Sequence, residues 1–554
     1  MVEMNKTLAV WIFRSVIFIG VLWFAFWIFI WEPFAWNKTF GEALFVNPLN
    51  TVMFIGCVIV GVASWFIPTT KTKSPITLYV EHLKIIRKQI GSDVGYIRVI
   101  LIAVGIIAFT LACVSLIGVK LSDMGSGEFF IEKITPLGYW IGITVLMTTA
   151  TIAWNHFSKK ESTPILFIFL SALLLFSVRM LFAEIFTNPI VYEPDVVMYD
   201  NTIRSWTTTG IDFGVQGNYQ HDFPMAFLIA YSFVKLGVPL DVFLRYAPVF
   251  VSLLDFFLIY LILNKIDPQN KTCAATSVFI FAFSSLGYWI PANYCPQSIG
   301  TVFYFLSLYL TVSFAKKGTW TFRTIAPLFL SIFFLILSHH LSTLYFVLTL
   351  LGFAVSIRFF SKDTYGDFRG KEIIPFIVAI FAYSFWFLYG NTFYPLFFNF
   401  QKYFSFQGSI SGDIATSTTF DQITAIIYPL FVSSLFLYAL VKSMEIRKRS
   451  DIRKIFAKLK DAQNRLGPYL VYSFGFVFIA IFCAIGLVIA AVEPFRLLEI
   501  TMISVLPISS QALISLRGNP SRKKEILLLF MLNLILITSV HRYYRQIQRR
   551  VINW

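Results

Sequence analysis

The sequence predicts an all-helical protein that crosses a lipid bilayer many times, and three observations indicate this class. Of the 554 residues, 57% are apolar and only 13% are charged, whereas globular domains carry about a quarter charged residues. The mean hydropathy is +0.73. Apolar runs of about 20 residues, the helical length that crosses a hydrocarbon core of roughly 30 Å, recur along the chain. This balance excludes an ordinary soluble domain.

About fifteen apolar segments are long enough to be predicted as membrane-spanning helices. Tryptophans fall near the ends of several of them, where their side chains anchor helices at the membrane interface. In chain order the predicted spans cover residues 9–31, 50–67, 97–119, 136–154, 163–186, 240–264, 272–289, 297–315, 324–338, 341–357, 373–389, 421–441, 467–491, 497–514 and 526–540.

Short basic loops predict how the chain is oriented in a cell membrane. Cytoplasmic loops of membrane proteins carry an excess of lysine and arginine, so the N-terminus is expected in the cytoplasm and loop 187–239 on the extracytoplasmic face. The orientation of the basic tail after His541 stays open, because this scheme places it outside against the rule. The basic loops lie at residues 71–88, 159–160, 316–323, 442–465 and 517–524.

The same clustering accounts for the formal net charge of +16, so nucleic acid is not indicated as a partner. Membrane lipids are the expected surroundings. Four of the five cysteines lie within apolar runs, and the sequence contains no Cys-x-x-Cys pair or Cys/His cluster. Neither a zinc site nor a disulfide framework is therefore indicated.

The chain is expected to have three parts, of which the second holds the informative segment. Residues 1–160 form an N-terminal extension of four membrane helices, residues 161–515 form the core, and residues 516–554 hold the last helix and the basic tail. Within the core, loop 187–239 is polar and acidic in a protein poor in acids. Because an irregular polar backbone cannot lie in hydrocarbon, this loop is expected outside the bilayer or along a wet cavity.

The first half of the loop predicts a short amphipathic helix over residues 195–209. Asp195 is expected at its N-cap, and Gly210 at its C-terminal end. Asp200 and Arg204 stand four residues apart and are therefore expected to pair on one helical face.

The apolar run 223–237 is too short to span a bilayer and begins with Phe-Pro. It predicts a re-entrant or interfacial helix that returns the chain to the membrane.

This layout resembles that of the GT-C membrane glycosyltransferases, which use polyprenyl-phosphate sugars, and more loosely their oligosaccharyltransferase and protein O-mannosyltransferase relatives. The resemblance covers about residues 163–515. The first four helices have no counterpart in it, and the family's Tyr-Pro-Pro element is reduced here. In chain order, the motifs that carry it are Glu193-Pro194-Asp195 at a helix exit, Gly210, His221-Asp222-Phe223-Pro224, Leu244-Arg245-Tyr246-Ala247-Pro248, Pro296-Gln297 and Ser338-His339-His340.

The resemblance implies a GT-C-like bundle that transfers a sugar from a polyprenyl-phosphate-linked donor to an acceptor outside the cell. Such transfer needs a base for the acceptor proton, and a positioned carboxylate contributes roughly 10²–10⁴-fold. Asp195 matches the family's acidic position and is the expected general base. Glu193 and Asp200 are the alternatives, and a role for Asp195 as helix cap alone stays open.

The phosphate that leaves requires a cation at the membrane surface, which arginine supplies in a bidentate geometry. The resemblance favours Arg496, and Arg245 is the second candidate. For both residues the competing interpretation is an arginine that snorkels to the interface.

The histidines are further candidates for contact with the sugar, the phosphate or a metal. His339 and His340 lie at a predicted break between two short helices, and a hydrogen-bonded structural turn is the competing interpretation. His221 and Asp222 would join Asp195 around a divalent cation, if one is used. No cofactor is required by the sequence.

Two other functions stay open at this point. A polytopic transporter or lipid flippase predicts paired charges near the bilayer midplane, and the sequence offers Asp255 in the middle of the predicted span 240–264, with no second charged residue expected nearby. A non-catalytic assembly protein with a GT-C-like fold is the other alternative. The sugar, the acceptor, the carrier length and the oligomeric state are not determined by the sequence.

Overall fold

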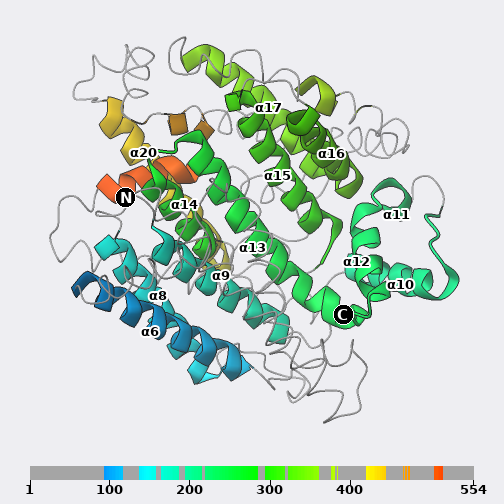
Figure 1. Cartoon of the computed structure of the whole chain (residues 1–554), viewed down its shortest axis with the longest axis horizontal. Coiled ribbons are helices and arrows are strands. Elements are labelled where there is room, and N and C mark those ends of the chain that lie inside the picture. The colour runs from blue at the N-terminus through cyan, green and yellow to red at the C-terminus, as the bar shows by residue number, and fades with distance from the viewer. Residues whose placement is uncertain are drawn as a thin grey trace, which may run out of the picture.

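The computed structural model describes residues 93–116, 136–157, 164–185, 194–214, 219–284, 294–317, 322–360, 376–380, 384, 419–444, 466, 468–470, 472–473 and 505–515. Within these residues the chain is helical and contains no strand, so the all-helical fold class is confirmed there (Figure 1). The predicted spans 9–31, 50–67 and 526–540 lie outside the described residues. The helices are α6 (Asp93–Leu116), α8 (Leu137–Phe157), α9 (Ile165–Ile185), α10 (Pro194–Thr209), α11 (Tyr219–Asp222), α12 (Met225–Lys235), α13 (Leu240–Ile266), α14 (Lys271–Ser284), α15 (Pro296–Lys317), α16 (Phe322–Ser338), α17 (His340–Phe360) and α20 (Thr419–Met444).

Four helices in the described part of the chain are long and apolar enough to cross a membrane. Only 28% of the α6 window is buried inside the protein, and its exposed side chains include Ile100, Ile107 and Val114. Large apolar side chains on such a face are expected to meet lipid, as in a membrane protein. The four spanning segments are Ile97–Leu116, Leu137–Trp154, Leu240–Ile266 and Pro296–Ala315.

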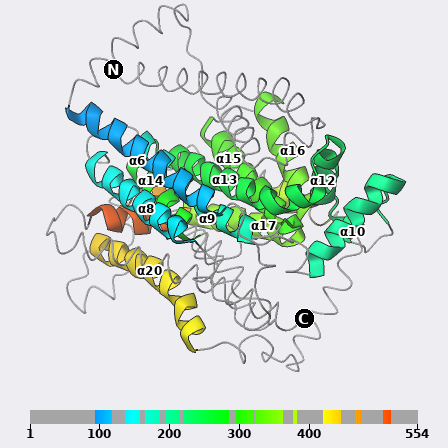
Figure 2. The same ribbon diagram turned by 90° about the horizontal axis from the view of Figure 1, so that it is seen from below.

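Small residues let α6 and α8 lie side by side (Figures 1 and 2). A Cβ atom on Gly142 of α8 would lie 2.6 Å from the carbonyl oxygen of Ala108 and 2.7 Å from the amide nitrogen of Ala112. Backbones approach this closely in membranes where small residues face each other, because packing drives association there. The two helices share a hydrophobic core with α9, α13 and α14.

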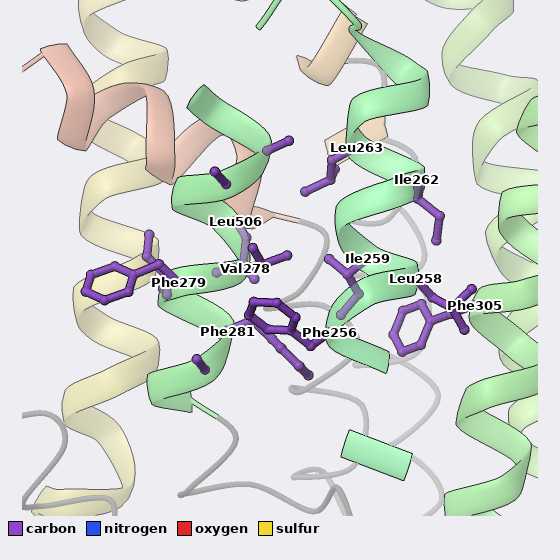
Figure 3. Close-up of a cluster of buried hydrophobic side chains, with 14 of the residues drawn as sticks. Phe256, Leu258, Ile259, Ile262, Leu263, Val278, Phe279, Phe281, Phe305 and Leu506 are labelled. Carbon is purple, nitrogen blue, oxygen red and sulfur yellow. The ribbon is translucent and has the colours of Figure 1, made fainter. Parts of the chain in front are cut away.

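The centre of that core lies between α13, α14 and α15 (Figure 3). Phe256 of α13 and Phe281 of α14 point toward each other there, and Leu506 of the helical segment 505–515 adds to the same cluster. Pairs of hydroxyl groups join the helices where the apolar packing is interrupted. Ser277 and Ser510 lie 3.0 Å apart, and Ser307 of α15 lies 2.8 Å from Ser331 of α16.

A second, smaller core lies at one end of the bundle, where α10 and α12 pack beside the start of α13 (Figure 2). Trp206 is its largest buried side chain, with 1% of its surface exposed. Its ring contacts Phe227 and Tyr231 of α12, and its indole N–H donates to the carbonyl of Asp212 at 2.6 Å. The amphipathic helix is therefore held by its apolar face, as its sequence pattern requires.

The boundaries of the two helices in loop 187–239 differ slightly from the predicted ones. The first begins at Pro194 rather than after Asp195, because proline fits the first helical position, where its missing N–H is not needed. Gly210 ends it with φ +94°, and its amide donates to Trp206 O at 3.2 Å, so the predicted C-terminal glycine is confirmed. The second helix, α12, is shorter than the run 223–237.

Replacing Gly142 with alanine is expected to destabilise the protein by roughly 1–3 kcal/mol, because the new methyl group meets backbone atoms that cannot move separately. Gly105 of α6 provides the matched control, because its Cβ would meet the end of the flexible Leu170 side chain and not backbone atoms. Gly105→Ala should therefore stay within about 1 kcal/mol of the parent. Thermal unfolding in detergent compares the two variants, and equal melting temperatures would contradict the backbone contact.

Candidate functional site

The candidate residues are described to different extents. Glu193 and Arg496 lie outside the described residues. Asp195 is the second residue of α10, and the structure describes its backbone but not its side chain. The site is therefore built from Asp200, Arg245 and the histidine motifs.

Asp200 is tied to Arg204, as its spacing in the sequence predicted. Arg204 Nε lies 2.8 Å from Asp200 Oδ2, and the other end of the guanidinium reaches Asp241 Oδ1 on α13 at 2.5 Å. The hydrogen bond that Arg204 donates to Asp200 is the largest cause of a raised pKa at Arg204, so the guanidinium stays charged. Because Asp200 is 4% exposed and holds this bridge, the arrangement favours a structural role for it over one as base.

His221 and Asp222 form a pair at the end of α11. His221 Nδ1 lies 2.9 Å from Asp222 Oδ1, and Asp222 is 1% exposed. A carboxylate in this position accepts a hydrogen bond from Nδ1–H, and this leaves a lone pair on Nε2 of a neutral ring. The preceding residue, Gln220, accepts a hydrogen bond from Thr202 of α10 at 3.3 Å. The residue next to the pair is thus connected to α10, and the carboxylate orients the imidazole ring.

His339 and His340 occupy the break between α16 and α17, as predicted. The backbone N–H of Ser342 donates to His339 Nδ1 at 3.3 Å, and the Ser342 hydroxyl lies 3.0 Å from the same atom. A neutral His339 ring therefore carries its proton on Nε2. His339 is 4% exposed and stabilises the turn through its contacts with Ser342, whereas His340 is only partly buried.

A ring contact brings the two histidine motifs together. The Phe223 ring, next to the His221–Asp222 pair, lies 5.2 Å from the His340 ring, which in turn lies 4.9 Å from the His339 ring. These residues are more than a hundred positions apart in the sequence. The contact therefore brings the two motifs together at the α10 end of the bundle. The sequence alone predicted only that both motifs lie on the same side of the membrane.

Arg245 lies on α13, one helical turn beyond Asp241, and is partly buried. Residues four apart share a helical face, so Arg245 is on the face of α13 that Asp241 presents to α10. Arg245 therefore places a cation in the second turn of α13, the helix that follows the α10–α12 segment.

The expectation that Asp255 has no charged neighbour is wrong. Asp255 is fully buried on α13, accepts a hydrogen bond from Thr301 of α15 at 2.9 Å, and is attracted by Arg179 of α9. Arg179 is itself only 3% exposed. An ionisable side chain inside a membrane span usually needs a partner. This argument drew attention to Asp255, and it applies equally to Arg179 in the predicted span 163–186.

The described residues contain no group of three or more His, Cys, Asp or Glu side chains that could hold a metal ion. His221 and Asp222 supply two ligands at most to such a site, and a third would have to come from outside the described side chains, for example from Asp195 or Glu193. The geometry therefore gives a divalent cation only part of the ligand set that it needs.

Replacing Arg204 with methionine is expected to loosen α10, because the buried Asp200 carboxylate then loses its only hydrogen-bond donor among the described side chains. The cost of a buried unsatisfied acceptor is roughly 1–3 kcal/mol. Asp241→Asn is the matched control and should cost under about 1 kcal/mol, because that pair is exposed. Hydrogen–deuterium exchange of the α10 amides measures both effects; exchange that is as slow in Arg204→Met as in Asp241→Asn would contradict the anchoring role.

No protein-family model matches the chain, and no curated protein is similar enough to it to count as a relative. The resemblance to the GT-C glycosyltransferases therefore depends on the sequence motifs alone. What the described site provides is a histidine–carboxylate pair, a histidine break and a bridged acidic helix at one end of a membrane bundle.

Proposed function

We propose that this protein is a membrane glycosyltransferase of the GT-C type. It takes a sugar from a polyprenyl-phosphate-linked donor and transfers it to an acceptor hydroxyl on the extracytoplasmic face of the cell membrane. The observation that supports this most directly is the contact between Phe223 and His340, because it joins the two histidine motifs next to α10, the helix whose first turn contains Asp195.

The chemistry divides among the candidate residues as follows. The acceptor oxygen forms a bond to the anomeric carbon while the bond from that carbon to the donor phosphate breaks, and the electron pair of the broken bond leaves with the phosphate. The hydroxyl proton passes to Asp195 as general base. Arg496 and Arg245 offset the charge on the departing phosphate.

The histidine motifs have supporting roles in this proposal. His221 is held by Asp222 in the tautomer whose Nε2 can accept a proton or a hydrogen bond. His340 presents a partly buried ring that contacts Phe223, two residues after His221. Both are suited to contact the sugar hydroxyls or the phosphate, whose polar groups need partners at the edge of the bilayer.

A transporter is the second candidate, and one observation favours it. Arg179 and Asp255 are two ionisable side chains that are buried among apolar helices and close enough to interact electrostatically, as a transporter would require. Both side chains are almost fully enclosed, and Asp255 already binds Thr301. We therefore prefer sugar transfer, and release of labelled lipid-linked sugar across proteoliposomes, with no glycosylated product, would favour the transporter.

Asp195→Asn is expected to lower sugar transfer by roughly 10²–10⁴-fold, because the amide cannot take the acceptor proton. The assay measures transfer from a lipid-linked donor in membranes that carry the variant at parental abundance. Asp212→Asn, in the same segment, is the matched control and should leave transfer unchanged. Unchanged transfer in Asp195→Asn would move the role of base to Glu193 or to the His221–Asp222 pair, and no transfer by the parent with any donor would favour a non-catalytic protein.

His340→Phe is expected to separate ring packing from chemistry. Phenylalanine keeps an aromatic ring against Phe223 and should leave the melting temperature near that of the parent, since aromatic pairs contribute only about 0.5–1.5 kcal/mol. Transfer should nevertheless fall on the order of 10²-fold, as when a polar contact to the reacting group is lost. His340→Ala removes both properties and should lower stability as well; full activity in His340→Phe would limit His340 to packing.

A further inference from the structure

Asp255 is connected to the histidine break through the first turns of α15. Asp255 Oδ2 accepts the hydroxyl of Thr301 at 2.9 Å, and that hydroxyl also lies 2.8 Å from the carbonyl of Ser298. Thr301 is in the second turn of α15, directly after Gly300. The carboxylate thus binds α15 near the N-terminal end of that helix.

Gly300 is in turn in tight contact with the break. A Cβ atom there would lie 2.7 Å from Ser342 Oγ and 2.8 Å from His339 Cβ. The contact leaves no space between α15 and the turn that holds His339. A shift of the first turns of α15 would therefore displace His339, and with it His340, whose ring contacts Phe223.

Burial explains why the hydroxyl of Thr301 matters to Asp255. Asp255 is fully buried, and among the described residues its Oδ1 atom has no hydrogen-bond partner. A buried polar group costs free energy unless it is hydrogen-bonded, so the bond from Thr301 offsets part of that cost. This bond joins α13 to α15, and Arg179 of α9, itself only 3% exposed, is close enough to attract Asp255.

We infer that Asp255 is a positioning residue: through its hydrogen bond with Thr301 it fixes the first turns of α15 and thereby keeps the His339–Ser342 turn in place. Its consequence for sugar transfer rests on the proposed function, but the placement of the turn does not. Asp255 acts here through Thr301 and Gly300 and has no contact with the reacting atoms.

The experiment measures how fast diethyl pyrocarbonate modifies each of the six histidines, with the full-length protein in nanodiscs and the sites resolved by mass spectrometry. Thr301→Val removes the hydroxyl and keeps the shape, so modification of His339 should become several-fold faster. Thr301→Ser restores the hydroxyl and should return the rate to that of the parent. Equal His339 rates in the valine, serine and parental proteins would overturn the inference.

Ser307→Ala is the matched control on the same helix. It removes a buried hydroxyl pair with Ser331 that lies two turns away from the break, so it loosens α15 to a similar degree without touching Gly300. His339 should keep its parental rate in this variant. Equally fast modification in Ser307→Ala and Thr301→Val would mean general loosening of α15 and would also overturn the inference.

A double variant keeps the test decisive if Thr301→Val does not assemble. Replacing Arg179 and Asp255 together with leucine removes both charges, an exchange that membrane-buried and core pairs often tolerate. The folded double variant should also show fast modification of His339, and a parental rate in it would count against the inference.

Sugar transfer is measured in parallel, so that the two proposals can fail separately. Changed histidine modification rates with no transfer by the parent would refute only the proposed function. Parental modification rates with active transfer would refute only the positioning role.

Discussion

Hydrocarbon supplies no hydrogen-bond partner, and the arrangement of this protein follows from that constraint. Many buried polar side chains of the described helices bond to another helix or to the backbone of their own helix. Hydroxyl groups meet in pairs between α14 and the segment 505–515 and between α15 and α16. Asp255 joins α13 to α15 through Thr301, while its second oxygen has no hydrogen-bond partner among the described residues. The polar contacts therefore set which helices lie together, while apolar packing fills the space between them.

The two hydrophobic cores stabilise different parts of the molecule. The large core joins the membrane helices, and the small core packs α10 and α12 against the start of α13. The histidine motifs come together on the turn beside Phe223 and at the break before α17. A site there would gain rigid support from the bundle and access to water from the polar segment. The proposed transfer from a lipid-held donor to a dissolved acceptor would need both.

The features that the sequence predicted correctly are local ones. The Asp200–Arg204 pair follows from a spacing of four, Gly210 from its position after an amphipathic run, and the break at His339 from the interruption of an apolar stretch. Each depends on residues within a few positions of each other, so pattern and propensity were sufficient.

The features that the sequence missed depend on distant segments. Asp241 as the second partner of Arg204 is 37 positions away, and the contact between Phe223 and His340 requires the whole bundle to be packed first. Arg179 was missed for another reason: a single arginine in an apolar run was counted as part of the span and not paired with an acid on another helix. The pattern of residues along one helix does not show which other helix will pack against it.

Tyr294, just before α15, has a consequence for how a long-chain lipid could enter the protein. Its hydroxyl donates to the carbonyl of Ala226 on α12 at 2.7 Å, and its ring rests 4.9 Å from that of Phe243 on α13. Burial raises the pKa of this phenol far above its ordinary value, so the proton needed for the bond is retained even in alkaline solution. Parting α12 from α13 would break this bond and separate the rings. Sideways entry from the bilayer is therefore costlier at this junction than where only methyl groups touch.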